Sequence, residues 1–252
     1  MEFEGKVVFV TAAAGAGIGQ AVARTFASEG ATVVISDQHA GRTEKVAASI
    51  ASDTGQDVIG FACDVRDEAR IDEVINGIVD KYGRLDIVVN NSGVNQLAPL
   101  HEMPTDIWRH VIDVSLTGPF LVTRRALGIM RAQKGGAIVN MSSIAGWMRP
   151  AEGESHYAAA KAGIMGFTRA AAMEGAPFGI RVNAVAPGLA WNEFLAKIYS
   201  TEYVDEMARQ TPLGRAGTPQ DVANAVAFLA SDKASFITGE VLCVSGGYHL
   251  HT

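Results

Sequence analysis

Tyr157 and Lys161 stand four residues apart in a segment, 154–173, whose pattern is typical of a helix, so both side chains are expected on one face. A tyrosine has a reference pKa of about 10 and acts as a general acid or base near neutral pH only if its phenolate is stabilised. A neighbouring lysine ammonium supplies that stabilisation. Ser143 follows an apolar run typical of a strand, and its hydroxyl could bind a substrate oxygen on which charge develops. Together the three residues predict acid-base chemistry at an oxygen, although each alone could be a surface residue or a turn cap.

A glycine-rich turn stands between the first expected strand and the first expected helix. Glycines there let the backbone approach a pyrophosphate, whose charge is bound by the free amides at the start of the helix. Glycines also serve plain tight turns, so the turn alone is weak evidence. The strand before it and the helix after it agree with a dinucleotide site. The predicted contacts are Gly15, Gly17, Ile18 and Gly19.

Two acidic residues that end expected strands complete this prediction. Asp37 follows the glycine turn by about twenty residues, and its carboxylate could accept hydrogen bonds from the adenosine ribose of NAD and would repel the 2′-phosphate of NADP. NAD is therefore the predicted cofactor. Arg42 is the nearest cation that could favour NADP instead, and a solvated turn residue is the plain alternative for Asp37. Asp64 is predicted to bind the adenine amine, with Val65 beside it, or else to cap a helix.

Short β-branched runs alternate with longer amphipathic segments from end to end of the chain. Most of the runs are continuously apolar, which is typical of parallel strands covered on both faces. This order predicts a single-domain, Rossmann-like α/β fold, a doubly wound sheet of about seven parallel strands with helices on both faces. The expected strands are 6–11, 32–37, 58–64, 85–91, 137–142, 181–186 and 240–244, and the clearest helices are 20–29, 67–81 and 154–173.

Residues 189–217 break this alternation. No linker divides the chain, so 1–252 is expected to be one dinucleotide-binding catalytic domain that carries this segment as an insertion. An insertion rich in large apolar residues just after a strand is a candidate substrate-binding lid. The alternative is a surface helix pair that packs its apolar stripe on the core. The large side chains are Trp191, Phe194, Leu195, Ile198, Tyr199, Tyr203 and Met207.

The order and spacing of these motifs resemble the short-chain dehydrogenase/reductase family over essentially the whole chain. The motifs are the glycine turn, Asn-Asn-Ser-Gly at 90–93, Ser143, Tyr157 with Lys161, Pro-Gly at 187–188, Thr-Gly-Glu at 238–240 and Gly-Gly at 246–247. The resemblance implies that Tyr157 exchanges a proton with the substrate oxygen and that Ser143 orients this oxygen. It also implies that Lys161 lowers the pKa of the phenol and binds the nicotinamide ribose.

The resemblance implies further cofactor contacts and an assembly. Asn192 stands where the family usually has a threonine that contacts the carboxamide. Members of the family often form tetramers through their last helices and strand, so a homotetramer is expected. The implied contacts are Asn91, Ser92 and Gly93 on the adenosine side, and Pro187, Gly188 and Asn192 on the nicotinamide side.

Three features depart from the family pattern. Ala12 stands where the family has the first glycine of the turn, and that turn is one residue longer than usual. The loop between Ser143 and Tyr157 is also one residue longer than the commonest form. Ser115 replaces the asparagine that, in the family, holds a water relaying protons to the lysine. Ser115 could still serve if the relay uses its main-chain carbonyl, whereas turnover would be slowed if the asparagine side chain is needed. An active enzyme with a modified relay is expected.

The composition argues against several classes of protein. The 252 residues carry a net charge of −6 and no basic run, so no nucleic-acid partner is expected. The apolar runs are too short for a membrane span, and residues 1–5 lack the pattern of an export signal. Cys63 and Cys243 are expected to be buried thiols in a reducing compartment, which makes the cytoplasm the default location. No metal site is expected from the spacing of His and Cys.

Several polar residues near the expected site receive plain interpretations. His156 is expected to make a packing or solvent contact and not to act as a second base. Glu152 and Glu154, in the loop before Tyr157, could repel or orient the substrate, but a solvated loop is their default interpretation. His249 and His251 lie in the tail, where metal binding has little support.

These observations predict an NAD-dependent oxidoreductase that interconverts a secondary alcohol and a ketone on a bulky or hydrophobic small-molecule substrate. The 11–15 turn, Ser115 and residues 187–195 further resemble a bacterial branch that acts on hydroxyacyl-CoA intermediates, including those of sterol ring breakdown. A 3-hydroxyacyl-CoA or a cyclic, steroid-like alcohol is therefore expected. Two alternatives stay open: an NADPH-dependent 3-oxoacyl-carrier reductase, which Asp37 opposes, and a non-catalytic NAD-binding sensor or scaffold, which only Ala12 and Ser115 favour.

Overall fold

The computed structural model describes residues 1–148, 150–193 and 195–250. Across these residues seven strands form one sheet in the order β3-β2-β1-β4-β5-β6-β7, and every neighbouring pair is parallel. The order confirms the predicted doubly wound fold. The strands are β1 (Val7–Val10), β2 (Thr32–Asp37), β3 (Val58–Ala62), β4 (Ile87–Asn90), β5 (Gly136–Met141), β6 (Ile180–Pro187) and β7 (Val241–Val244).

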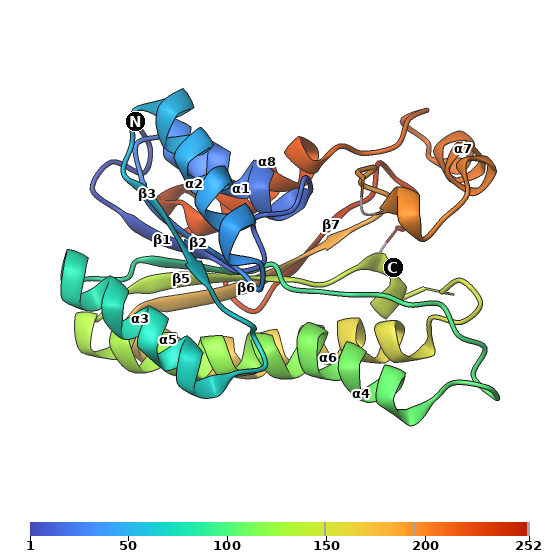
Figure 1. Ribbon diagram of the computed structural model, residues 1–252, viewed down its shortest axis with the longest axis horizontal. Coiled ribbons are helices and arrows are strands. Elements are labelled where there is room, and N and C mark those ends of the chain that lie inside the picture. The colour runs from blue at the N-terminus through green and yellow to red at the C-terminus, as the bar shows by residue number, and fades with distance from the viewer. Residues whose placement is uncertain (149, 194, 251–252) are drawn as a thin grey trace.

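Helices cover both faces of the sheet, which explains why most of the strands are apolar throughout (Figure 1). One face is covered by α1 (Ile18–Ser28), α2 (Ala40–Thr54) and α8 (Pro219–Ala230). The other is covered by α3 (Glu68–Tyr82), α5 (Gly118–Gln133) and α6 (Ser155–Gly175). Two shorter helices, α4 (Thr105–Ile112) and α7 (Thr201–Gln210), lie towards one end of the molecule.

The predicted strand 32–37 matches β2 residue for residue, and the other boundaries differ by one or two residues. Helix α3 begins after Asp67, whose side chain accepts a hydrogen bond from Arg70 N at 3.0 Å. The alternative in which Asp64 caps this helix is therefore wrong. Gly83 follows the helix with φ +73°, a left-handed conformation that glycine adopts without steric cost.

The two cysteines have different environments. Cys63 directly follows β3 and is 5% exposed, whereas Cys243 lies in β7 and is partly exposed. The expectation of two buried thiols is thus wrong for Cys243, because β7 is an edge strand with a neighbour on one side only. Both thiols are free. Separately, no helix in the described part of the chain combines the length and the apolar character needed to cross a bilayer.

Candidate active site

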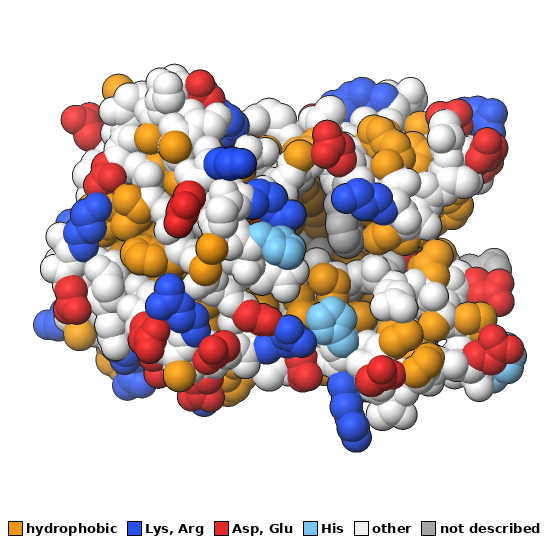
Figure 2. All heavy atoms as spheres, in the orientation of Figure 1, with side chains coloured by type: hydrophobic (Ala, Val, Ile, Leu, Met, Phe, Trp, Pro, Cys, Tyr) orange, Lys and Arg blue, Asp and Glu red, His pale blue; other side chains and the backbone are white. Residues whose placement is uncertain are grey.

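The carboxyl ends of the strands surround one cavity of about 440 Å³. Ligands of doubly wound sheets bind at this edge, where the strand order reverses, and here the reversal lies between β1 and β4. Figure 2 shows the molecule hollowed between the side of α7 and the side of α4. All the predicted site residues except Ser115 line this cavity: Gly15, Gly17, Ile18, Gly19, Asp37, Asp64, Val65, Asn91, Ser92, Gly93, Ser143, Tyr157, Lys161, Pro187, Gly188 and Asn192.

The glycine turn has the geometry of a phosphate cradle. Helix α1 begins at Ile18, and no side chain of the described residues caps its first turn, which leaves the first backbone amides available to an anion. A Cβ on Gly15 would have no atom within 4 Å, so the backbone there borders open space. A Cβ on Gly19 would lie 2.4 Å from Asn91 Nδ2, so Gly19 instead lets the helix pack on the loop after β4. The turn therefore fits a dinucleotide.

Ala12 carries the strain of this turn. Its φ of +51° is left-handed, at the position where the family resemblance places a glycine. For a non-glycine residue this conformation costs roughly 1–2 kcal/mol. Asn91 Nδ2 donates to Ala12 O at 3.0 Å and to Thr11 O at 3.1 Å, and these two bonds hold the strained segment in place.

Replacing Gly19 with alanine is expected to lower the free energy of unfolding by about 1–3 kcal/mol, the usual cost of overpacking. The new methyl group would meet both Asn91 Nδ2 and, at 3.0 Å, the backbone oxygen of Ala12. Urea denaturation measures this change. Gly15→Ala is the matched control: it should leave stability unchanged but weaken dinucleotide binding, since its methyl group enters the open space. Equal stabilities for the two variants would contradict this account of the turn.

Asp37 presents its carboxylate at the adenosine end of the cavity with its side chain 8% exposed. Its Oδ1 accepts from Arg42 Nη2 at 2.8 Å and from His39 N at 3.2 Å. Both bonds use the same oxygen, so Oδ2 is the one available to a ribose hydroxyl. Arg42 also lines the cavity, and its pairing with Asp37 neutralises the cation that a 2′-phosphate would need.

Asp64 and Val65 border the cavity beside Asp37. Arg66 donates to Asp64 Oδ2 from Nη2 at 2.5 Å, and this side-chain bond is the main reason that the pKa of Asp64 lies below its usual range. Asp64 thus stays ionised as an acceptor, which binding an adenine amine requires. A Cβ on Gly118 would lie 2.8 Å from a methyl carbon of Val65, so the start of α5 packs closely against Val65.

Ser115 lies behind the cavity wall, fully buried in the π-helical turn Asp113–Thr117 between α4 and α5. Its Oγ accepts from Val94 N at 3.2 Å and donates to Val94 O at 3.4 Å. The nearby Ser92 Oγ donates to Val114 O at 3.1 Å. The structure therefore does not bring the side chain of Ser115 to the cavity; that side chain fixes the loop after β4 to this turn.

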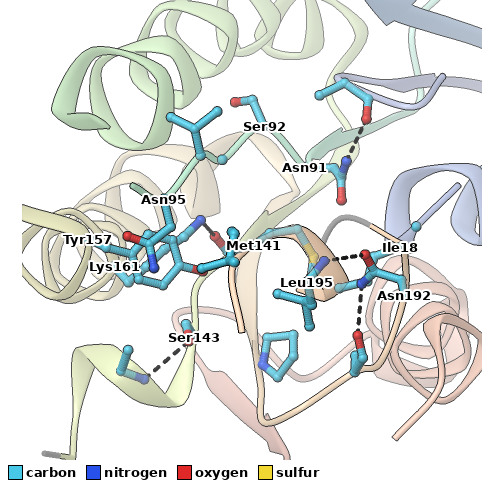
Figure 3. A pocket seen from close by; sticks show the side chains of 18 of the residues that line it. Ile18, Asn91, Ser92, Asn95, Met141, Ser143, Tyr157, Lys161, Asn192 and Leu195 are labelled. Carbon is cyan, nitrogen blue, oxygen red and sulfur yellow. Dashed lines mark hydrogen bonds between the residues drawn. The ribbon is translucent and has the colours of Figure 1, made fainter. Parts of the chain in front are cut away.

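Ser143, Tyr157 and Lys161 lie together at the other end of the cavity (Figure 3). The side chain of Ser143 lies close enough to the hydroxyl of Tyr157 to lower its pKa. Ser143 Oγ also accepts from Ala145 N at 3.2 Å, which orients the serine. Lys161 Nζ donates to Met141 O at 2.7 Å and lies 5.5 Å from the centroid of the Tyr157 ring.

Burial shifts the pKa values of Tyr157 and Lys161 in opposite directions. Burial raises the pKa of Tyr157 to about 12; the nearby side chain of Ser143 opposes this shift and the negative charge of Glu154 adds to it. Burial lowers the pKa of Lys161 to about 8. The lysine amine donates to the carbonyl of Met141 and is not among the groups that shift the pKa of the phenol in this arrangement.

The residues that precede Tyr157 are buried. His156 Nδ1 accepts from Tyr157 N at 2.8 Å, so Nε2 carries the proton that it donates to Gln96 O at 2.9 Å. Both ring nitrogens are used, which confirms the packing role expected for His156. Glu152 is exposed as expected, whereas the expectation of a solvated position is wrong for Glu154, which is 5% exposed.

Asn95 is a cavity residue that the sequence analysis missed, and for Glu154, named there as able to repel or orient the substrate, it missed the burial. The Glu154 carboxylate accepts from Asn95 Nδ2 at 2.7 Å and from the hydroxyl of Tyr199. Nothing in the composition of the loop marks Glu154 as buried. Its position three residues before Tyr157, hence on the same face of the helix start, is the signal that could have found it.

The segment 189–217 faces the cavity. Asn192 Oδ1 accepts from Leu195 N at 3.3 Å, and a Cβ on Gly17 would lie 3.7 Å from Asn192 Cγ, so this segment approaches the glycine turn. Trp191 does not line the cavity, and Phe194 lies outside the described residues. The large side chains that do line it are Leu195, Ile198, Tyr199, Tyr203 and Met207.

The end of the chain packs against the loop after β5. The ring of His249 stacks on Trp147 with 5.4 Å between centroids, and His251 lies outside the described residues. Within the described residues no cluster of three or more His, Cys, Asp or Glu side chains could hold a metal ion. The chemistry that the cavity offers is therefore a hydroxyl, a phenol and an amine beside a dinucleotide cradle, which suits proton exchange at an oxygen next to hydride transfer.

Comparisons with known proteins agree with this geometry. A family model described as enoyl-(acyl carrier protein) reductase matches residues 12–249. The chain is 48% identical to the (5R,7aS)-5-hydroxy-7a-methyl-1-oxo-2,3,5,6,7,7a-hexahydro-1H-indene-carboxyl-CoA reductase of Mycobacterium tuberculosis, over 96% of this chain and 92% of that protein. It is 42% identical to a 3-oxoacyl-(acyl-carrier-protein) reductase of Thermotoga maritima, over 98% of this chain and 99% of that protein. The solved structure of an NAD⁺-bound xylitol dehydrogenase matches with a TM-score of 0.91 and 32% identity, over 98% and 100% of the two chains.

Proposed function

This chain belongs to the short-chain dehydrogenase/reductase family, and from that premise we propose that it is an NAD-dependent oxidoreductase that interconverts a secondary alcohol and a ketone. The observation that carries the proposal is the convergence of Ser143, Tyr157 and Lys161 with the glycine turn on one cavity. A dinucleotide bound there would accept the hydride in oxidation and supply it in reduction.

The chain's own residues manage the proton and the orientation of the substrate. Tyr157 takes the hydroxyl proton in oxidation and returns it in reduction. Ser143, whose side chain lies near the phenol, holds the substrate oxygen beside it. Lys161 borders the same space and binds the nicotinamide ribose. The side chain of Ser115 is committed to Val94, so any part that this residue has in a proton relay falls to its main-chain carbonyl.

NAD is the proposed cofactor because Asp37 meets the ribose with a buried carboxylate and holds Arg42. The adenosine half would lie along Asp64, Val65 and the loop 91–93. The nicotinamide half would lie along Pro187, Gly188 and Asn192. The NAD⁺-bound xylitol dehydrogenase, similar in fold and at 32% identity, supports this choice.

The substrate class follows from the walls of the cavity. Leu195, Ile198 and Met207 present an apolar surface from the segment 189–217, which we propose as a substrate-binding lid for a bulky, hydrophobic alcohol. The name of the M. tuberculosis relative describes a hydroxylated hexahydroindene joined to CoA, which supports a 3-hydroxyacyl-CoA or a cyclic, steroid-like alcohol for this chain. We extend the proposal to a cytoplasmic homotetramer, which the family resemblance and the two free thiols support.

The second candidate is an NADPH-dependent 3-oxoacyl-carrier reductase, which the T. maritima relative favours and Asp37 opposes. A sensor without catalysis is opposed by the presence of Ser143, Tyr157 and Lys161 together in the cavity.

The test is the appearance of the reduced dinucleotide with NAD and NADP at equal concentration, across a panel of 3-hydroxyacyl-CoA esters, cyclic alcohols and steroids. We expect turnover with NAD on at least one bulky secondary alcohol. Preferred oxidation of NADPH with a 3-oxoacyl carrier would favour the second candidate. Tight NAD binding without turnover on the panel or on the matching ketones would favour a sensor.

A further inference from the structure

Glu154 is a buried carboxylate at the wall of the cavity, held entirely by neutral donors. Its Oε1 accepts from Asn95 Nδ2 at 2.7 Å and from the hydroxyl of Tyr199, and its Oε2 accepts from Ala151 N at 2.8 Å. No cation among the described residues forms an ion pair with it. A buried charge without an opposite charge is costly and acts strongly on its neighbours.

Three separate segments of the chain hold this carboxylate in place. Asn95 comes from the loop after β4, Glu154 precedes α6, and Tyr199 belongs to the segment 189–217. Asn95 Nδ2 also lies 3.3 Å from the Tyr199 hydroxyl, so the three side chains form a closed cluster. Asn95 Oδ1 is buried and has no hydrogen-bond partner among the described residues, so the amide is oriented by the two donor contacts to Glu154 and Tyr199.

The cluster is next to the proton-exchanging tyrosine. Glu154 and Tyr157 are three residues apart at the start of α6, so their side chains lie on one face, and both line the cavity. Asn95 also lines the cavity, and Figure 3 draws it on the same side as Tyr157. Burial is the main cause of the raised pKa of Tyr157, and the charge of Glu154 raises it further. Lys161, the cation on the same helix, is bonded to Met141 O.

We propose that Glu154 is a positioning residue of the reaction: its buried negative charge holds the proton on Tyr157, and Asn95 and Tyr199 keep that charge in place. The inference rests on the proposed function, in which Tyr157 exchanges the proton with the substrate oxygen. It adds a preference for one direction of the reaction. A tyrosine that retains its proton is ready to donate it to a ketone, whereas oxidation must first remove that proton, so the cluster favours reduction at neutral pH.

The direction of the pH effect follows from the sign of the charge. A carboxylate disfavours the phenolate, so its removal lowers the pKa of Tyr157. The other titratable groups that face this end of the cavity are Lys161 on the same helix, Tyr199 and Tyr203 on the segment 189–217, and Tyr248 near the C-terminal end. All of them stay in place in a Glu154 variant, so a shift can be assigned to the carboxylate.

The experiment compares Glu154→Gln, which keeps the shape and removes the charge, with the wild-type protein. The pH profile of kcat/KM is measured with the alcohol that the panel identifies as a substrate. The midpoint of the rise of kcat/KM with pH is expected about one pH unit lower in Glu154→Gln than in the wild type. The same shift is expected without substrate, in ¹³C NMR of tyrosine-labelled protein. Only five tyrosines contribute to the spectrum, and the resonance of Tyr157 is identified by its loss in Tyr157→Phe.

Matched variants separate charge from structure. Glu154→Asp retains the charge, so its midpoint should stay close to that of the wild type. Tyr199→Phe removes one bond to the carboxylate but leaves the charge, and should raise KM without lowering the midpoint. Asn95→Ala removes a donor that holds Glu154 Oε1 and should move the midpoint in the same downward direction by a smaller amount, and it replaces the main variant if Glu154→Gln does not fold. Coincident midpoints in the wild type and Glu154→Gln, or an equal downward shift in Tyr199→Phe, would overturn the proposal. The NMR midpoint decides it even if no alcohol is turned over, an outcome that would count only against the proposed function.

Discussion

Replacement of Tyr157 by phenylalanine is expected to lower kcat by about 10²–10⁴-fold, the usual contribution of a positioned general acid or base. The phenol lines the cavity together with Ser143, whose side chain lowers its pKa. Phenylalanine keeps the ring and its packing but cannot exchange a proton. Steady-state kinetics with the best substrate of the panel measure the loss.

The binding of NAD supplies the control for this variant. Tyr157 is remote from Asp37 and from the glycine turn, so the dissociation constant of NAD, measured by calorimetry, should change little. Unchanged turnover in Tyr157→Phe would show that another group moves the proton, and the assignment of the site would then be wrong. A loss confined to KM would assign Tyr157 to substrate binding alone.

Replacement of Asp37 by alanine is expected to raise the preference for NADP over NAD, expressed as the ratio of kcat/KM values, about 100-fold. Two causes act together. The carboxylate that would repel the 2′-phosphate is removed, and Arg42 loses the partner that it contacts at 2.8 Å. The freed guanidinium lines the cavity and can bind a phosphate. Kinetics with the two cofactors at a fixed substrate concentration measure the ratio.

The double variant Asp37→Ala with Arg42→Ala tests the second cause. Like the single variant, the double variant should bind NAD less tightly because the carboxylate is gone. Its kcat/KM with NADP should rise less than that of the single variant. If the single and double variants have the same ratio, the contribution of Arg42 is disproved and only the repulsion remains. A wild-type enzyme that already prefers NADP would contradict the role given to Asp37.

The fold was predictable because its signals are local. The run 32–37 is apolar and β-branched up to Asp37, and the strand ends at that residue, as predicted. The glycine turn was recognisable from its position between such a run and a helix. Tyr157 and Lys161 were predictable because a spacing of four residues on a helix fixes their common face whatever surrounds them.

The parts of the site that were not predictable depend on contacts between distant segments. Glu154 stands in a loop whose composition suggests solvent, and its burial comes from Asn95 and Tyr199, which are 59 and 45 residues away along the chain. The bond from Lys161 to the carbonyl of Met141 spans 20 residues and places the lysine amine on that carbonyl, a contact that the spacing of Tyr157 and Lys161 does not reveal. Ser115 is recognisable as a substitution, but only its bonds to Val94 show that its side chain faces away from the cavity.

The central place of β1 in the sheet has a consequence for the synthesis of the protein. Val8 of β1 is paired with Val33 of β2 on one side and with Ile87 of β4 on the other. When β1, β2 and β3 have left the ribosome but Ile87–Asn90 has not, the edge of β1 that pairs with β4 in the finished sheet is therefore open to other chains. The strand β1 contains no charged residue and no proline, the features that discourage pairing with a strand of another chain. Slow translation between β3 and β4, or fragments that end there, should accordingly be the main source of aggregated protein during expression.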